Sequence, residues 1–211
     1  MTNKYITPPR TEWPKLTARA GESDQDIETS VRATLEYVRT KGDDALLNLE
    51  SKYDGVTFSS AEALRVSEKE IEEAAASVPQ ELKDAIAQAY SNIKKFHEAQ
   101  LPEIVRVETS PGVTCVQKAV PIRRVGLYVP GGRAPLFSTV LMLAIPAQVA
   151  GCQEIVLCTP PGKDGKASGA IVYAASVCGV RNIFKIGGAQ AIAAMAYGTR
   201  TLAKCDKIFG P

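Results

Sequence analysis

The segment V-G-L-Y-V-P-G-G-R-A-P, residues 125–135, constrains the fold more than any other part of the chain. It begins as a short apolar strand, which Pro130, Gly131 and Gly132 then break. The apolar run 136–149 predicts a helix directly after this turn. A strand, a Gly-rich turn and a helix start can present backbone N–H groups to an anionic ligand. The two glycines are adjacent and follow a proline, unlike the dinucleotide pattern G-x-G-x-x-G, so a plain connection without a ligand stays open.

A second turn of the same kind, I-G-G-A-Q at residues 186–190, precedes the helix-forming run 191–197. Strands that alternate with helices after Pro121 indicate right-handed crossovers and a parallel sheet. Both turns then lie at the carboxyl edge of the sheet, where open α/β sheets bind ligands. The expected order is strand 124–129, helix 136–150, strand 154–159, helix 168–178, strand 182–186, helix 189–197 and strand 206–209.

The residues before this part predict helices and one β-hairpin. Apolar residues at helical spacing predict two long helices, near residues 24–41 and 80–99, with shorter helices between them. Near Glu103 the pattern changes to alternation, which Pro111-Gly112 divides into two strands. The expected fold class is therefore α/β, with N-terminal helices and a small β-hairpin followed by a Rossmann-like, four-stranded parallel sheet covered by helices. The expected regions are 1–102 (helical), 103–120 (β-hairpin connector) and 121–211 (α/β unit).

Charge and hydropathy exclude several classes of partner. The 211 residues carry a net charge of +2, which gives no electrostatic basis for binding nucleic acid or a membrane surface. The N-terminus has no apolar run long enough for a signal peptide, and the apolar stretch 140–150 is too short to span a bilayer. We therefore expect a cytoplasmic protein.

The cysteines and the single histidine do not provide a structural zinc site. There are five cysteines, none of them in a C-x-x-C pair. His97 is expected to be a surface or capping group at the end of its helix. Cys152 follows a helix C-terminus, where the helix dipole does not lower the pKa of a thiol. We therefore expect all five cysteines to be buried small apolar residues.

Two polar side chains follow the strand ends and are the leading candidates for ligand contact. The Tyr128 ring can stack on a planar ligand while its hydroxyl bonds a ribose or phosphate; capping of the sheet edge is the open alternative. Gln190 is expected in the first turn of its helix, with its amide facing the ligand crevice. Ser138 and Thr139 lie near another helix start, where capping is the simpler expectation and a pocket hydroxyl the alternative.

Several segments closely resemble histidinol dehydrogenases, and they occur in that family's order. The resemblance covers nearly the whole chain, although family members are considerably longer. The segments are KGDDAL (41–46), NIKKFHEAQ (92–100), the run from VGLYVPGG to CTPP (125–161), CGVRNIFKIGGAQAIAAMAYGT (178–199) and KCDKIFGP (204–211).

The resemblance implies an NAD- and zinc-dependent enzyme that oxidises L-histidinol through L-histidinaldehyde to L-histidine, in the last steps of histidine biosynthesis. It implies that Tyr128 and Gln190 contact NAD, with Pro130, Gly131 and Gly188 as further candidates. The family's zinc ligands and its Glu-His pair for proton transfer are expected beyond the end of this chain. No catalytic residue or metal ligand is therefore expected within it, and the chain alone is expected to be inactive. The family is a homodimer in which each subunit completes the active site of the other.

Two other functions remain open. One is a non-catalytic α/β module for dimerisation or nucleotide binding. The other is a different NAD-linked, aldehyde-oxidising enzyme with Cys152 as its nucleophile, which fits less well because nothing in the sequence activates that thiol.

Overall fold

The computed structural model describes residues 5–17, 24–131 and 135–211. Contacts divide the chain into two units, residues 1–33 and 34–211. The first unit contains the short helices η1 (Arg10–Glu12) and α1 (Trp13–Thr17). The Trp13 indole N–H donates to the carbonyl oxygen of Pro8 at 3.1 Å, and the Arg10 guanidinium lies 5.5 Å from the centre of the indole ring. The one tryptophan of the chain is thus held by its own neighbours.

Local sequence features set the bounds of the helices that precede the sheet. Helix α2 (Asp24–Lys41) ends before Gly42, whose φ of +55° suits glycine. Ser67 and Glu70 form a capping box, because the Glu70 N–H donates to the Ser67 hydroxyl while the Ser67 N–H donates to the Glu70 carboxylate. The other elements here are α3 (Asp43–Leu49), the π-helical turn η2 (Glu50–Asp54), η3 (Ala61–Leu64), α4 (Glu68–Ser77) and α5 (Gln80–Glu98).

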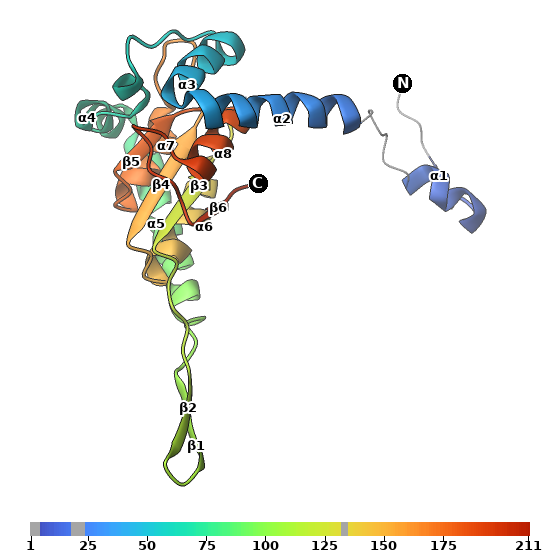
Figure 1. Ribbon diagram of the computed structural model, residues 1–211, viewed down its shortest axis with the longest axis vertical. Coiled ribbons are helices and arrows are strands. Elements are labelled where there is room, and N and C mark those ends of the chain that lie inside the picture. Colours follow the sequence, from blue (N-terminus) through green and yellow to red (C-terminus); the bar gives the residue numbers. More distant parts are fainter. Residues whose placement is uncertain (1–4, 18–23, 132–134) are drawn as a thin grey trace. The chain divides into compact units, whose positions relative to one another are not determined.

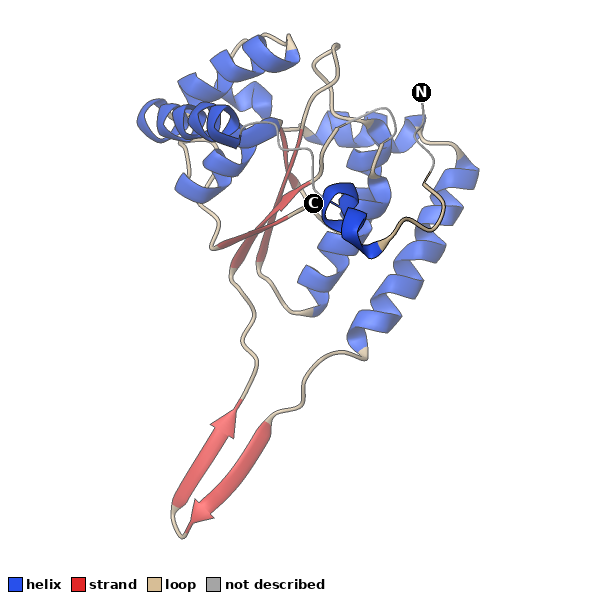
Figure 2. Cartoon of the chain, turned by 90° about the vertical axis from the view of Figure 1, so that its right-hand side faces the viewer, coloured by secondary structure: helices blue, strands red, loops and turns tan. Residues whose placement is uncertain are grey.

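Strands β1 (Val105–Ser110) and β2 (Val113–Gln117) form an antiparallel hairpin that extends away from the main sheet (Figures 1 and 2). Every residue of both strands is exposed. The expectation that all five cysteines are buried is therefore wrong for Cys115, which lies on β2. The reason is that no second layer of described residues covers this hairpin.

Four parallel strands form the main sheet, in the order β5-β4-β3-β6 (Figure 1). Leu127 on β3 pairs with Leu157 on β4 and with Phe209 on β6. This arrangement confirms the expected fold class, and each element agrees with its expected bounds to within one residue at either end. The elements are β3 (Arg124–Tyr128), α6 (Phe137–Val149), β4 (Glu154–Thr159), α7 (Gly169–Val177), β5 (Asn182–Lys185), α8 (Gly188–Tyr197) and β6 (Lys207–Phe209).

Different helices cover the two faces of the sheet. One apolar cluster joins Leu127 to α4, α5, α6 and α7, and the other joins Phe184 to α3 and α8. Helix α8 packs directly on the backbone of β3, because a Cβ at Gly126 would lie 2.6 Å from the sulfur of Met195. Side chains alternate along a strand, so Tyr128 lies on the same face as Gly126. Tyr128 is therefore directed toward α3 and α8.

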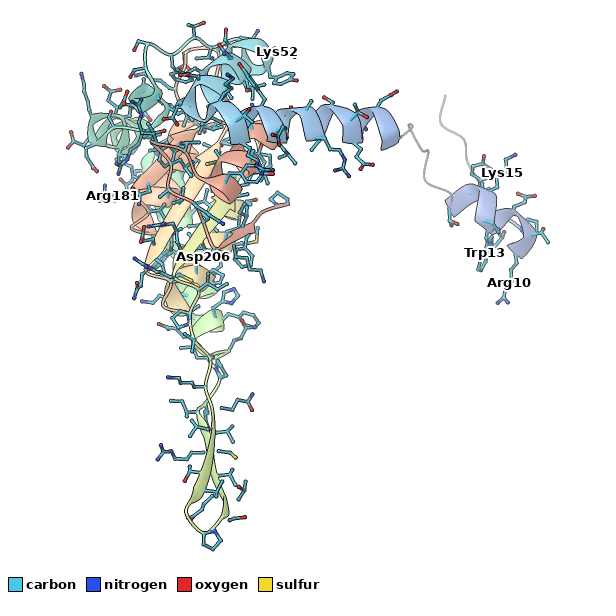
Figure 3. The ribbon with its side chains drawn as sticks, viewed as in Figure 1. Arg10, Trp13, Lys15, Lys52, Arg181 and Asp206 are labelled. Atoms are coloured by element: carbon cyan, nitrogen blue, oxygen red, sulfur yellow. The ribbon has the colours of Figure 1, made fainter. Side chains whose placement is uncertain are left out.

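Polar contacts join the amino ends of the strands. Asp206, labelled in Figure 3, directly precedes β6 and accepts the backbone N–H of Arg124 at 3.0 Å. Arg181, also labelled there, directly precedes β5 and pairs with Glu68 of α4 at 3.5 Å. Across the described residues, no helix combines the length and the apolar character that a membrane span requires.

Candidate functional site

A hydrogen bond joins the two glycine-containing turns at the carboxyl edge of the sheet. The hydroxyl oxygen of Tyr128, at the end of β3, accepts the backbone N–H of Gly188 at 3.0 Å. Gly188 follows β5, and β4 lies between these two strands. The tyrosine side chain thus reaches over the end of β4 to the turn that follows β5. The two turns, 60 residues apart, are brought together as the parallel sheet predicts.

Pro160, which directly follows β4, separates the two turns. A Cβ at Gly131 would lie 2.6 Å from the Cγ of Pro160, and a Cβ at Gly187 would lie 2.8 Å from its Cβ. Both glycines are therefore required by close packing against one proline ring. No motif in the sequence points to Pro160. The signal that could have found it is its position at the end of the middle strand, at the same edge as both turns.

The end of β6 approaches the same tyrosine. A Cβ at Gly210 would lie 2.8 Å from the carbonyl oxygen of Tyr128, so this backbone packs directly over β3. Of the other candidates, Pro130 is partly buried, whereas Gly131 and Gly188 are exposed at the sheet edge. Gly132, the second glycine of the first turn, lies outside the described residues. Three strand ends thus converge on Tyr128.

Gln190 lies in the first turn of α8, as expected, but its side chain is buried and hydrogen-bonded to Glu50. Its carboxamide Nε2 donates to Oε1 of Glu50 at 3.0 Å. The same carboxylate oxygen accepts the backbone N–H of Gly187 at 3.2 Å. Glu50 therefore holds both ends of the second turn. Gly188 between them has a φ of +54°, which favours glycine.

Glu50 is a site residue that the sequence analysis missed. Its side chain is fully buried, and it lies four residues after Leu46, on the inward face of the helix. A glutamate at an apolar position of a helix is the signal that could have found it, because a buried carboxylate needs specific partners. The partners come from the second turn and the start of α8, far away in the sequence.

Burial sets the protonation state of Glu50. It raises the pKa of this carboxyl from 4.5 to about 8, with the nearby charge of Asp54 adding to the rise and the hydrogen bonds from Gln190 and Gly187 opposing it. Glu50 is therefore predominantly protonated at neutral pH. Its second oxygen, Oε2, is buried with no hydrogen-bond partner among the described residues.

The hydroxyl of Tyr128 is a donor at neutral pH. Burial is the main cause that raises its pKa, and the charges of Asp54, Cys158 and Glu50 add to the rise, while the bond from Gly188 opposes it. The bond from Gly188 uses an oxygen lone pair and leaves the O–H proton available to a ligand. On Gln190, the carboxamide oxygen makes no hydrogen bond within the described part of the chain. The Tyr128 O–H thus remains for a ligand, and the Gln190 oxygen is an unused acceptor on a side chain that is only 2% exposed.

Three other candidate residues, Ser138, Thr139 and His97, lie in helices. The capping expectation for Ser138 and Thr139 is wrong, since α6 begins at Phe137 and its N-cap is Leu136, with no side-chain cap. Because the helix already begins at Phe137, both hydroxyls lie within its first turn. His97 lies in the last turn of α5, where its Nδ1 is 2.7 Å from the Gln100 amide oxygen.

Cys152 shows no activation as a nucleophile. It is partly buried in an apolar cavity of about 460 Å³, lined also by Ile122, Met142 and Phe209. Burial raises the pKa of its thiol. Since the thiolate is the reactive form, these surroundings oppose a catalytic role.

The described residues contain no group of three or more histidine, cysteine, aspartate or glutamate side chains that could hold a metal ion. Zinc bound by protein side chains alone needs about four such ligands. The described side chains therefore do not fit a zinc site.

Comparisons with known proteins all point to one family. The family model for histidinol dehydrogenase matches residues 17–211. The histidinol dehydrogenase of Bacteroides thetaiotaomicron is 52% identical over 204 residues, which cover 97% of this chain and 47% of that protein. The enzyme of the same name from Mannheimia succiniciproducens is 55% identical over 93% of this chain and 44% of its own length.

A solved structure supports the same family. The crystal structure of histidinol dehydrogenase from Elizabethkingia anophelis superposes with a TM-score of 0.87 and 48% identity, covering 98% of this chain and 47% of that chain. The chain thus spans about half the length of the relatives that it matches.

Proposed function

The chain belongs to the histidinol dehydrogenase family, and we propose that it provides the NAD-binding half of an enzyme that oxidises L-histidinol. The proposed reaction passes through L-histidinaldehyde to L-histidine, the final steps of histidine biosynthesis. When bound, NAD⁺ supplies the acceptor for the hydride. The activity is proposed for the whole enzyme, because this chain spans about half of its relatives.

The observation that carries this proposal is the hydrogen bond between Tyr128 and Gly188. It joins the ends of two strand–turn–helix units at the carboxyl edge of a parallel sheet, which is where such sheets bind nucleotides. The Tyr128 O–H then donates to the ribose or phosphate, and its ring provides a flat apolar surface. The free carboxamide oxygen of Gln190 accepts a bond from the cofactor.

Backbone groups complete the proposed contact. Pro130, Gly131 and Gly188 line the two turns, and the exposed glycines let the cofactor approach the main chain closely. The N-terminus of α8, a ten-residue helix, also favours a negatively charged diphosphate through the helix dipole.

We further propose that the zinc ligands and the proton-transfer pair come from outside this chain, since its described side chains offer no metal cluster. The chain alone is then inactive. The proposed homodimer has a specific support. The β1–β2 hairpin is exposed along both strands, including Val105, Val107 and Val116, and isolated two-stranded hairpins are only marginally stable in water. A second chain would cover it. The cytoplasm is the proposed location, as it supplies NAD for biosynthesis.

Calorimetric titration of the chain with NADH tests the proposal. We expect measurable binding, and a dissociation constant about fivefold higher for Tyr128→Phe, which loses the O–H donor to the cofactor and the acceptor for the Gly188 N–H. The control is Tyr5→Phe, an exposed tyrosine in the N-terminal unit, which should bind like the wild type. Equal affinity of Tyr128→Phe and wild type would refute the assigned site. In parallel, the chain mixed with histidinol, NAD⁺ and Zn²⁺ should form no NADH.

A non-catalytic module is the outcome if the chain dimerises without binding NADH. Analytical ultracentrifugation of the same sample distinguishes this result, because it measures association independently of the nucleotide.

A further inference from the structure

We propose that Glu50 is a positioning residue for the nucleotide, because its Oε1 fixes the Gly187 N–H and the Gln190 carboxamide in the orientation that ligand contact requires. This inference rests on the proposed function and adds to it a residue outside both glycine-containing turns. Glu50 lies in η2, directly after α3, and touches no part of the exposed edge, since its side chain is fully buried.

Glu50 determines the orientation of the Gln190 carboxamide. An amide side chain can rotate to exchange its oxygen and nitrogen, and only a specific partner fixes which of the two faces a ligand. Glu50 accepts from Nε2, so the nitrogen is directed inward. The carboxamide oxygen lies on the side of Gly188, where a Cβ would be 2.8 Å from it. Glu50 thus selects the acceptor as the group that Gln190 offers.

Glu50 also helps to fix the backbone of the turn at Gly187. The Gly187 N–H precedes the exposed Gly188, whose own N–H is used by Tyr128. Glu50 holds the Gly187 N–H and Tyr128 holds the Gly188 N–H, so two successive peptide groups of one turn are fixed. Preformed geometry of this kind raises affinity because less ordering is left to binding.

The protonation state of Glu50 determines the charge beneath the proposed site. The titratable groups that face Glu50 are Asp54 on its own turn, Tyr128 on β3 and Cys158 on β4. Burial raises the pKa of Tyr128 and of Cys158, so both stay neutral, and Asp54 is the only negative neighbour among these. A protonated Glu50 therefore adds no negative charge beneath a site for an anionic nucleotide. When Glu50 loses its proton, a buried negative charge is added to that of the partly buried Asp54 and opposes that ligand.

The experiment compares Glu50→Gln and Glu50→Leu with the wild type and with Glu72→Gln, an exposed glutamate on α4 that serves as control. Glutamine keeps an acceptor for Gly187 and Gln190 but cannot ionise, whereas leucine removes the acceptor. Calorimetry with NADH should give wild-type affinity near neutral pH for Glu50→Gln and for the control. Glu50→Leu should bind about tenfold more weakly.

The pH profile separates positioning from a merely structural role. The wild-type affinity for NADH should fall as the pH rises through about 8, the range in which Glu50 ionises, while the affinity of Glu50→Gln stays level. A wild-type profile as level as that of Glu50→Gln, or a Glu50→Leu variant that binds like the wild type, overturns the proposal. If Glu50→Leu does not fold, the comparison of profiles between wild type and Glu50→Gln still decides.

Hydrogen exchange without ligand keeps this proposal distinct from the proposed function. In Glu50→Leu, and not in Glu50→Gln, amides of the segment 186–191 should exchange faster than in the wild type. If the wild type binds no NADH, the NAD-binding function fails, and the exchange data alone then decide whether Glu50 positions the turn. Unchanged exchange in Glu50→Leu would overturn the positioning role.

Discussion

Arg124 and Glu154 form a two-pronged ion pair that joins the amino ends of β3 and β4. The Arg124 Nε donates to Glu154 Oε2 at 2.7 Å, and its Nη2 donates to Oε1 at 2.8 Å. The same arginine also donates to the carbonyl oxygen of Lys204, just before β6. Arg124 thus connects three strands at the edge opposite to Tyr128. Stability contributed at one end of β3 can therefore be separated from binding at the other.

The first prediction follows from that separation. Arg124→Lys keeps the charge but cannot form two parallel bonds to one carboxylate. We expect the free energy of unfolding to fall by about 1 kcal/mol, since both side chains are only partly buried. Urea denaturation measures the loss. The affinity for NADH should not change, and a weaker affinity would show that the two edges of the sheet are coupled.

The second prediction concerns stability and pH. The pKa of Glu50 is raised from 4.5 to about 8, so between these values the folded chain holds a proton that the unfolded chain has released. The unfolded state binds fewer protons in this window, and the free energy of unfolding therefore decreases as the pH rises. The contribution is fully present below the lower value and is lost above the upper one.

We expect a loss of a few kcal/mol, with about 5 kcal/mol as the upper bound, because the pKa rises from 4.5 to about 8 and one pKa unit corresponds to about 1.4 kcal/mol. Urea denaturation from about pH 5 to about pH 9 measures it. Glu50→Gln, which does not titrate, should show a flatter dependence. Parallel curves for the two proteins would contradict the raised pKa.

The third prediction concerns thiol reactivity. Cys115 is exposed on the hairpin, whereas Cys158, Cys178 and Cys205 are buried. Burial raises the pKa of Cys178 to about 12 and that of Cys205 to about 11, so neither forms thiolate at neutral pH. With a disulfide reagent at about pH 8, one thiol should react rapidly, and Cys115→Ser should remove that phase. Rapid reaction of the buried thiols in the folded protein would contradict this packing.

The sequence predicted the fold well because the α/β part is locally specified. Apolar strands such as 154–159 are bounded by glycine and proline, and a parallel sheet then has to place Tyr128 and Gln190 at the same edge. The residues that hold these two in place were not predictable in the same way. Glu50 meets Gln190 across 140 residues, and no local pattern states which helix packs under which turn. Burial of Cys115 was expected from composition, but its hairpin is exposed to solvent.

The last prediction uses Pro160 to test how the two turns are held apart. Gly131→Ala would place a Cβ 2.6 Å from the Cγ of Pro160, and Gly187→Ala would place one 2.8 Å from the Cβ of the same residue. Each change should lower the free energy of unfolding by about 1–3 kcal/mol, because the neighbouring turn has to move. The two clashes differ in the atom that causes them.

Pro160→Ala removes Cγ but keeps Cβ, so it should relieve the clash of Gly131→Ala and leave that of Gly187→Ala. Double-mutant cycles by urea denaturation measure this difference. We expect a coupling energy of about 1 kcal/mol for the pair of Gly131 and Pro160, and none for the pair of Gly187 and Pro160. Because neither glycine has a positive φ, strain of the backbone does not obscure the result. Equal coupling in both cycles would mean that loss of the proline ring loosens the whole edge, and that close packing does not set the distance between the turns.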